Sequence, residues 1–265
     1  MIVDTRRLFC RLLRAFEVTT VCDVGSMDGR DALRFRRALP RADIIALEPN
    51  PRNFALMQAD PQLALGRIRI MPLAASDRDS DAPFFVVEAD YVRTRNPGRR
   101  GMSSLHRRSD GSRLSEVVQV RTMRLDGMLL SDDCARDRLA LWIDTEGMAF
   151  ETISGAARIL DRTLLIHVEV ETVPCIGAAQ RLFPDVEKML HDAGFCLLAT
   201  DYPVSVPQFN ALFVRAEALE QKAAETGWHI ACERLHRGTK HAVRPLVPPR
   251  LRRFLARGLG ALRRP

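Results

Sequence analysis

Residues 19–50, TTVCDVGSMDGRDALRFRRALPRADIIALEPN, contain two short apolar runs separated by a more polar segment. The runs at 19–25 and 42–48 are apolar almost throughout, which is typical of strands that are covered on both faces of a parallel sheet. The segment at 28–39 between them is predicted to be a helix. This stretch therefore indicates a strand–helix–strand unit of an α/β fold.

The same alternation continues to residue 214. A helix is expected at 51–60, with proline in its first turn. Beyond it we expect a strand at 68–75, a hairpin-like pair near 84–88 and 117–125, a strand at 139–144, a helix at 148–160, a strand at 164–170, a helix from Pro184 to just before Gly194, and strands at 195–199 and 211–214. The last two strands are close enough in sequence to pair antiparallel. The pattern predicts a doubly wound α/β fold with a mostly parallel sheet, which binds ligands at the carboxyl ends of its strands.

The composition is that of a globular protein with room for a sizeable core. The chain has 265 residues, of which 46% are hydrophobic and 28% are charged. We expect a helix at 1–18, a main domain at 19–216 and a helical, basic extension at 217–265. No run of about 18 uncharged apolar residues occurs, and the six cysteines form no CxxC pair. These features predict a cytoplasmic protein with free thiols and no zinc site.

The net charge of +7 is concentrated at one end of the chain. Residues 229–265 hold ten Lys or Arg against the single acid Glu233, and the rest of the chain has a slight excess of acids. Within 249–262, leucines and Phe254 recur at helical spacing with arginines between them, as in basic helices that lie on anionic membranes. Packing of this helix on the body or on a partner fits the pattern equally well. Nucleic acid is disfavoured because the tail has few aromatic residues.

The ends of the first three predicted strands carry residues suited to a nucleoside. At the first strand end we expect cofactor contacts from Asp23, Gly25, Ser26, Asp28 and Gly29, because glycine allows a tight turn and close backbone approach. Methionine stands at the middle glycine position of the dinucleotide fingerprint, which disfavours nicotinamide. After the second strand come Glu48, Pro49 and Asn50, and Glu48 has the spacing of an acid that accepts from ribose hydroxyls. Asp77, after the third strand, could accept from an adenine amino group.

Several blocks resemble the FkbM-type methyltransferases in order and spacing. They are DVGSMDGRDALRF (23–35), ALEPNPRNF (46–54), PLAASD (72–77), GMSSL (101–105), VRTMRLDGML (120–129), WIDTEGMAFETISGA (142–156) and HVEVE (167–171). The resemblance covers about residues 20–215. It implies a Rossmann-like class I methyltransferase with a seven-stranded sheet, S-adenosyl-L-methionine as cofactor, and O-methylation of sugars or related hydroxylated products. This chain departs from commoner members, which have GANIG at 25–29 and IDVEG at 143–147.

Carboxylates gather at the next two strand ends. Asp144 and Glu146 follow the fourth strand, and His167, Glu169 and Glu171 alternate along one face of the fifth. An alcohol acceptor must lose its proton during methyl transfer, so a base is needed near its oxygen. We predict that Asp144, Glu146 and Glu169 supply that chemistry without a metal. A divalent cation held by the same carboxylates, or His167 as the base, are the alternatives.

Two classes of function fit these features. The leading hypothesis is an S-adenosylmethionine-dependent O-methyltransferase acting on a hydroxyl of a carbohydrate, glycolipid or related natural product. The alternative is a non-catalytic, nucleoside-binding subunit of a membrane-associated glycan-assembly complex. In either case the basic tail could make peripheral membrane contact, with packing on the body or on a partner as the alternative, and we expect no nucleic-acid partner.

Overall fold

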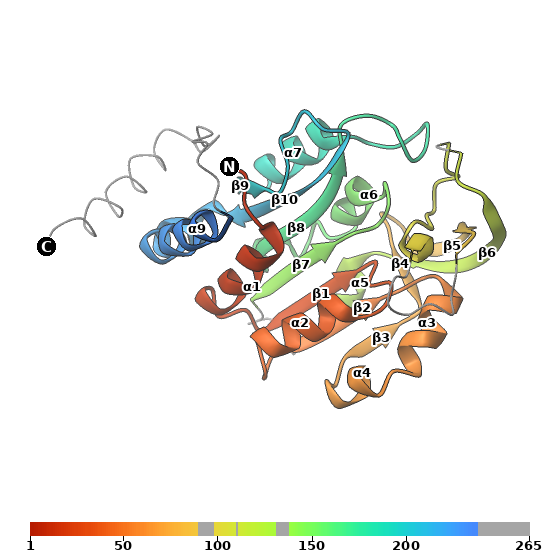
Figure 1. The fold of residues 1–265 in the computed structure, drawn as a ribbon, viewed down its shortest axis with the longest axis horizontal. Coiled ribbons are helices and arrows are strands. Elements are labelled where there is room, and N and C mark those ends of the chain that lie inside the picture. The colour runs from red at the N-terminus through yellow and green to blue at the C-terminus, as the bar shows by residue number, and fades with distance from the viewer. Residues whose placement is uncertain (90–97, 110, 131–137, 238–265) are drawn as a thin grey trace, which may run out of the picture.

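A computed structural model describes residues 1–89, 98–109, 111–130 and 138–237. Its centre is a seven-stranded sheet in the order β3-β2-β1-β7-β8-β10-β9 (Figure 1). The strands are β1 (Thr20–Val24), β2 (Asp43–Leu47), β3 (Arg69–Met71), β7 (Leu139–Ile143), β8 (Thr163–Glu171), β9 (Phe195–Thr200) and β10 (Gln208–Arg215). Every pairing is parallel except those of β10, which runs antiparallel to β8 and β9. The predicted doubly wound fold and the antiparallel pair at its end are confirmed.

Helices cover both faces of this sheet. On one face lie α1 (Thr5–Ala15), α2 (Arg30–Ala38), α3 (Pro51–Gln58), α4 (Pro61–Leu65), α8 (Ala216–Gln221) and α9 (Ala223–Arg237), and on the other lie α5 (Leu125–Leu129), α6 (Ala149–Ser154) and α7 (Phe183–Asp192). The helix predicted at 148–160 is shorter than expected, since α6 ends at Ser154 and a 3-10 turn follows at Leu160–Arg162. Within the described ranges, no helix has the length and apolar character needed to cross a bilayer.

The strand predicted at 68–75 is wrong as a single element. It breaks at Pro72 into β3, at the edge of the large sheet, and β4 (Leu73–Ala75), which joins β5 (Ser80–Val87) and β6 (Leu114–Met123) in a second sheet of order β4-β6-β5. Proline has no N–H group to donate to a ladder, so the chain leaves the first sheet there. The hairpin-like pair expected near 84–88 and 117–125 is the antiparallel pair of β5 and β6.

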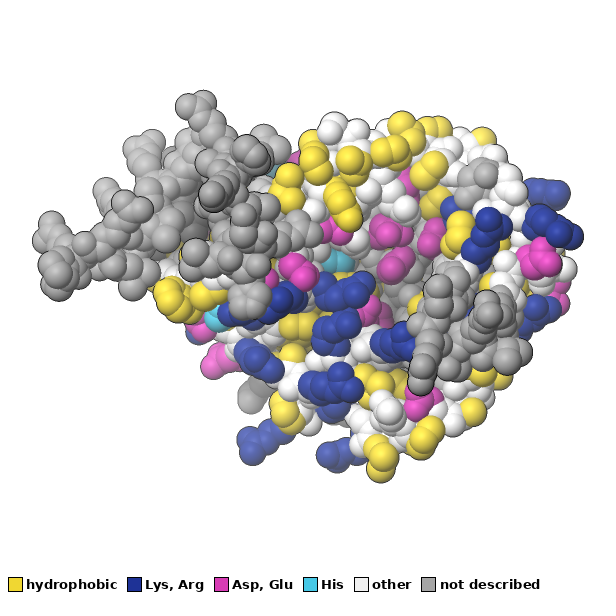
Figure 2. Space-filling model, viewed as in Figure 1, with side chains coloured by type: hydrophobic (Ala, Val, Ile, Leu, Met, Phe, Trp, Pro, Cys, Tyr) yellow, Lys and Arg dark blue, Asp and Glu magenta, His cyan; other side chains and the backbone are white. Residues whose placement is uncertain are grey.

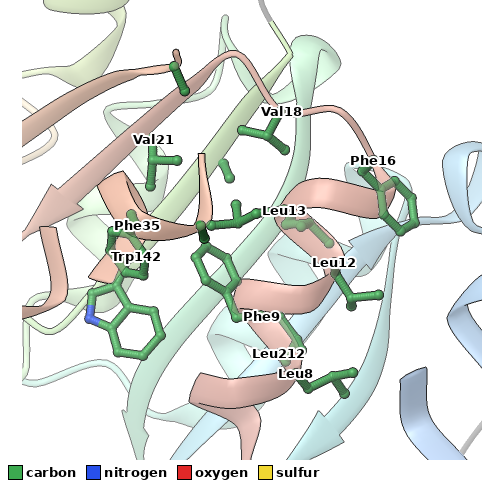
Figure 3. Close-up of a cluster of buried hydrophobic side chains, with 14 of the residues drawn as sticks. Leu8, Phe9, Leu12, Leu13, Phe16, Val18, Val21, Phe35, Trp142 and Leu212 are labelled. Carbon is green, nitrogen blue, oxygen red and sulfur yellow. The ribbon is translucent and has the colours of Figure 1, made fainter. Parts of the chain in front are cut away.

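The N-terminal helix α1 packs directly on the large sheet. Its first turn is capped by Asp4, whose side chain accepts from the Arg7 backbone N–H. Phe9 lies edge-on between Phe35 of α2 and Trp142 of β7, with ring centroids 5.5 and 5.4 Å away (Figure 3). This aromatic cluster joins α1 to the strand that ends at Asp144. The predicted amphipathic helix at 249–262 falls outside the described residues.

Phe9→Ala should destabilise the whole domain, because it removes a fully buried ring between two helices and the sheet. We expect a loss of about 3–5 kcal/mol in the free energy of unfolding, measured by urea denaturation. Leu65→Ala is the control, since Leu65 is 84% exposed and its truncation should change stability by less than about 0.5 kcal/mol. Equal stability of the two variants would show that α1 is not part of the cooperative core.

Candidate active site at the strand ends

The loop after β1 is held between the two neighbouring strands. Backbone N–H groups of Gly25 and Ser26 both donate to the Leu47 carbonyl at the end of β2, and the Asp144 N–H donates to the Val24 carbonyl. Gly25 has φ +83°, and a Cβ atom there would stand 1.8 Å from the Asp144 carbonyl oxygen. Glycine is therefore required by the backbone of β7 as well as by any ligand.

Asp23 lies beneath this loop and is almost fully buried. The Ser26 hydroxyl donates to its carboxylate over 2.6 Å. Burial raises the pKa of Asp23 to about 7, although the hydrogen bond from Ser26 acts in the opposite direction. The hydrogen bond from Ser26 to Asp23 thus helps to fix the position of the loop after β1.

Glu48, at the end of β2, organises the floor of a cavity. Its carboxylate accepts from the backbone N–H groups of Met27 (2.6 Å) and Asn50 (2.8 Å) and from the Asn53 side-chain amide (3.4 Å). Burial raises the pKa of Glu48 to about 7. Met27 reaches this carboxylate with φ +54°, a conformation that few non-glycine residues adopt.

The cavity holds about 490 Å³ of space, part of it open to solvent, at the carboxyl ends of β1, β2 and β4. Of the predicted cofactor residues, Gly25, Glu48 and Pro49 line it, and so does the predicted catalytic Asp144. Asn50 supports it from outside by capping α3, where its side chain accepts from the Arg52 N–H. The space suits a nucleoside whose sugar faces Glu48.

A segment that sequence reasoning only flagged forms one wall of the cavity. Ser103 and Ser104 belong to the GMSSL block, but no role was assigned to them. In the structure Arg100 is buried, its Nε donates to the Asn53 side-chain oxygen (3.2 Å), and the Asn53 amide donates back to the Arg100 carbonyl (3.1 Å). The Ser103 hydroxyl accepts from the Val87 N–H. The Asn53–Arg100 contacts link positions 47 residues apart and the Val87–Ser103 contact links positions 16 apart, which no local pattern signals.

Three other predicted cofactor residues do not line this cavity. Asp77 forms an ion pair with Arg78 (3.0 Å), which holds the pKa of Asp77 below its usual value. Asp28 pairs with Arg30 (3.2 Å) and borders a second depression between α2 and α3. Gly29 packs against the Leu63 side chain. The expected ligand contacts of these residues remain predictions.

The carboxylates after β7 and β8 do converge. Oxygen atoms of Asp144, Glu146 and Glu169 lie within 4.8 Å of one another. We call these residues, together with Glu171, the acid cluster. Burial raises the pKa of Glu169 well above its usual range, and the charges of the other three carboxylates raise it further. A hydrogen bond joins Glu169 to Asp144. Burial also raises the pKa of Asp144, but the hydrogen bond lowers it while raising that of Glu169, so Glu169 is the carboxyl of the pair that donates to Asp144.

Polar side chains from two loops and from strand β10 fix the acid cluster. Arg108 donates to Glu146 over 2.7 Å, and burial raises the pKa of Glu146 to about 7 despite that pair. Gln208, the first residue of β10, donates to Glu169 (2.9 Å) and to Glu171 (3.2 Å), and Gln180 donates to Glu171 (2.5 Å). The sequence patterns did not indicate these three residues because they come from separate segments of the chain.

His167 shares a face of β8 with Glu169 and Glu171, as predicted, but it lies deeper under α1. Its ring stacks on Trp142 with centroids 3.6 Å apart, and its Nε2 is 3.0 Å from the Thr5 hydroxyl. Burial lowers the pKa of His167 well below its usual value. A neutral, stacked imidazole beneath the acid cluster has a structural role, and the alternative of His167 as the base loses its support.

The same oxygen atoms could coordinate a hard divalent cation. Asp144, Glu146 and Glu169 are all carboxylates, the donor type that Mg²⁺ and Mn²⁺ prefer. Arg108 forms an ion pair with Glu146, and the charge of Arg6 acts on Asp144. The donor set fits a metal, so a metal-free role of these carboxylates stays a prediction.

Comparison with known proteins gives three kinds of match. A family model described as Methyltransferase FkbM domain matches residues 23–197. The 2-O-methyltransferase NoeI of Sinorhizobium fredii is 28% identical over 156 residues, which make up 56% of this chain and 62% of that protein. The chain thus spans less than two thirds of this relative's length.

Matches to solved structures are more distant. The precorrin-6y C5,15-methyltransferase of Geobacter metallireducens is 12% identical, with a TM-score of 0.38 over 77% of this chain and 84% of that one. The magnesium protoporphyrin IX methyltransferase of Synechocystis, with SAH bound, is 14% identical, with a TM-score of 0.42 over 80% of this chain and 81% of that one.

Gly25→Ala should be far more costly than another glycine substitution with the same backbone conformation. Gly111 has φ +80°, but a Cβ atom there would meet nothing within 4 Å. Gly111→Ala should therefore lower the free energy of unfolding only by the cost of the left-handed conformation, about 1–2 kcal/mol. Gly25→Ala must also displace the Asp144 carbonyl, so we expect a loss above about 4 kcal/mol in the free energy of unfolding. Similar losses in the two variants would contradict the close approach of β1 and β7.

Proposed function

The chain belongs to the FkbM methyltransferase domain family, and we propose that it transfers the methyl group of S-adenosylmethionine to a hydroxyl oxygen of a carbohydrate or a related hydroxylated compound. The family model covers residues 23–197, which include both the cavity-lining loops after β1 and β2 and the acid cluster. The expected family resemblance is thereby confirmed. NoeI of Sinorhizobium fredii is named a 2-O-methyltransferase, which supports oxygen as the acceptor atom.

Glu48 supports the nucleoside side of this proposal. Its two oxygens take three hydrogen bonds, whereas a carboxylate offers about four lone-pair sites. Ribose hydroxyls entering the cavity could use the remaining capacity and replace the long contact from Asn53. The polar groups around Glu48 would hold it in place while it accepts from the sugar.

Asp144 carries the proposal, because it belongs to both halves of the site. It lines the cavity and is also a member of the acid cluster. A methyl group presented from the cavity would therefore meet an acceptor hydroxyl at the carboxylates. Holding two reactants in line in this way supplies much of the rate of a displacement at carbon.

S-adenosylmethionine carries its methyl group on a positively charged sulfur. Transfer of this methyl group leaves a neutral thioether. The chain's residues then have to hold the acceptor and take its proton. In our proposal the acceptor hydroxyl donates to Asp144, which also accepts the hydrogen bond from Glu169. As the O–CH3 bond forms and the S–CH3 bond breaks, the hydroxyl proton passes to the Asp144 carboxylate and from there to water. Glu146, held by Arg108, lies beside Asp144 in the acid cluster.

Cofactor affinity should depend on Glu48. Charge-assisted hydrogen bonds to ribose hydroxyls contribute about 1.5–3 kcal/mol, so Glu48→Ala should weaken binding of S-adenosylmethionine and S-adenosylhomocysteine by about tenfold to a hundredfold, as measured by calorimetry. Asp81→Ala, which removes an exposed acid of β5, should bind as the wild type does. Unchanged affinity of folded Glu48→Ala would refute the ribose assignment.

Changes in the acid cluster should affect turnover more than they affect cofactor binding. Asp144→Asn, Glu146→Gln and Glu169→Gln keep side-chain size but remove a titratable oxygen. We expect at least one of them to lose about 10²–10⁴ in rate, the usual cost of removing a base, with nearly unchanged affinity for S-adenosylhomocysteine. The readout is the mass of surface glycans in a strain that lacks the protein and carries each variant in its place, where loss of activity appears as one missing methyl group.

A chelator separates the two roles of the cluster. If the carboxylates act as bases, EDTA leaves purified enzyme active, whereas loss of activity that Mg²⁺ or Mn²⁺ restores would make them metal ligands. Normal methylation by all three variants would show that the acid cluster is structural.

A further inference from the structure

The helices α1 and α2 form a surface that is rich in arginine and lies beside the acid cluster. Together they carry eight arginines, no lysine, and one acid, Asp31. The dark-blue side chains in Figure 2 gather over these two helices, next to the magenta side chains at the strand ends. Both helices contact each other and α1 also contacts α9. We call the exposed arginines of α1 and α2 the arginine face.

Spacing along each helix puts these arginines on common stripes. Arg7, Arg11 and Arg14 are four and three residues apart on α1, as are Arg30, Arg34 and Arg37 on α2. Arg36 and Arg14 also make structural contacts, because the Arg36 guanidinium donates to the carbonyls of Gly66 and Ala42 and that of Arg14 donates to the carbonyl of Ala38. Arg7, Arg30 and Arg37 are exposed members of the two stripes.

The acids around the arginine face do not balance it. Asp31 is shared by Arg6 and Arg34, Glu233 of α9 is shared by Arg7 and Arg11, and Asp28 pairs with Arg30. Burial lowers the pKa of Arg34, and the nearby charges of Arg6 and Arg37 lower it further. Crowded like charges destabilise the folded chain unless an anion binds to them. The surface is thus built for a partner with many negative charges.

The type of cation favours phosphate groups. A guanidinium presents a planar fork of donors that matches phosphate oxygens, and it is less strongly hydrated than an ammonium. The chain that follows α9 adds to this chemistry, since residues 238–265 hold eight Lys or Arg and no acid. Trp228 of α9 is 55% exposed, on the side opposite the buried Thr226 and Ile230. An exposed tryptophan is typical of membrane interfaces.

We propose that the arginine face is a docking surface for an anionic phospholipid bilayer. Arg6 ties this surface to the site: its guanidinium carbon lies 5.7 Å from the Trp142 ring, and Asp144 is the next residue on that face of β7. Docking would bring the acid cluster close to the lipid headgroups. The acceptor is then a saccharide carried on a membrane lipid, a conclusion that rests on the proposed function, whereas the docking does not.

Vesicle flotation tests the docking with the full chain. Wild-type protein should float with vesicles of equimolar phosphatidylglycerol and phosphatidylcholine, lose this binding as salt rises, and stay unbound to pure phosphatidylcholine. The triple variant Arg7→Gln, Arg30→Gln, Arg37→Gln should bind about 100-fold more weakly, from about 1 kcal/mol per arginine. The matched control is Arg69→Gln, Arg113→Gln, Arg121→Gln, which removes three exposed arginines from β3 and from β6 and its preceding loop and should bind as the wild type does.

Each other outcome overturns the docking. Equal binding by the two triple variants would assign all membrane contact to residues after α9, which both variants retain. Preference for single-stranded RNA over the anionic vesicles would identify a nucleic-acid surface. The single charge reversal Arg37→Glu, at an exposed position, gives the same readout should the triple variant fail to fold. Calorimetry with S-adenosylhomocysteine, which we expect to be unchanged in the docking variants, keeps failure of docking distinct from failure of the proposed function.

Discussion

The approach of Gly25 to the Asp144 carbonyl joins the two halves of the site. At that point β1 and β7 lie so close that a single Cβ atom would collide with the neighbouring backbone. The loop after β1 can therefore pass over the strand ends and place Met27 against Glu48, while Asp144 faces the same cavity from the other side. Without this contact the nucleoside cavity and the acid cluster would be separate features.

The second constraint is the burial of four carboxylates in one place. Like charges at such short range cannot all be ionised, so a proton is held on Glu169 and a guanidinium lies on Glu146. Beneath them the stacked Trp142 and His167, packed under α1, give the strand ends a rigid apolar base. The aromatic layer explains why α1, which lies outside the matched family domain, matters to the site.

Sequence patterns predicted the parts that depend on local chemistry. Apolar runs indicated the parallel strands, and an acid at a strand end indicated Glu48. The break at Pro72 was missed because apolar residues continue across it, and only the missing N–H sends the chain into a second sheet. Arg100, Arg108, Gln180 and Gln208 were missed for another reason: each contacts the site from a separate segment whose position depends on the whole fold. His167 lay on the predicted face, but only the depth of α1's packing distinguishes it from Glu169.

The most direct test of the proposed link between the cofactor cavity and the acceptor site is a crystal structure with S-adenosylhomocysteine bound. We expect both ribose hydroxyls to lie about 3 Å from Glu48 oxygens and the thioether sulfur to point toward Asp144, with the acid cluster beyond it. A nucleoside bound away from Glu48, or a sulfur directed away from Asp144, would contradict the claim that one residue, Asp144, links cofactor cavity and acceptor site.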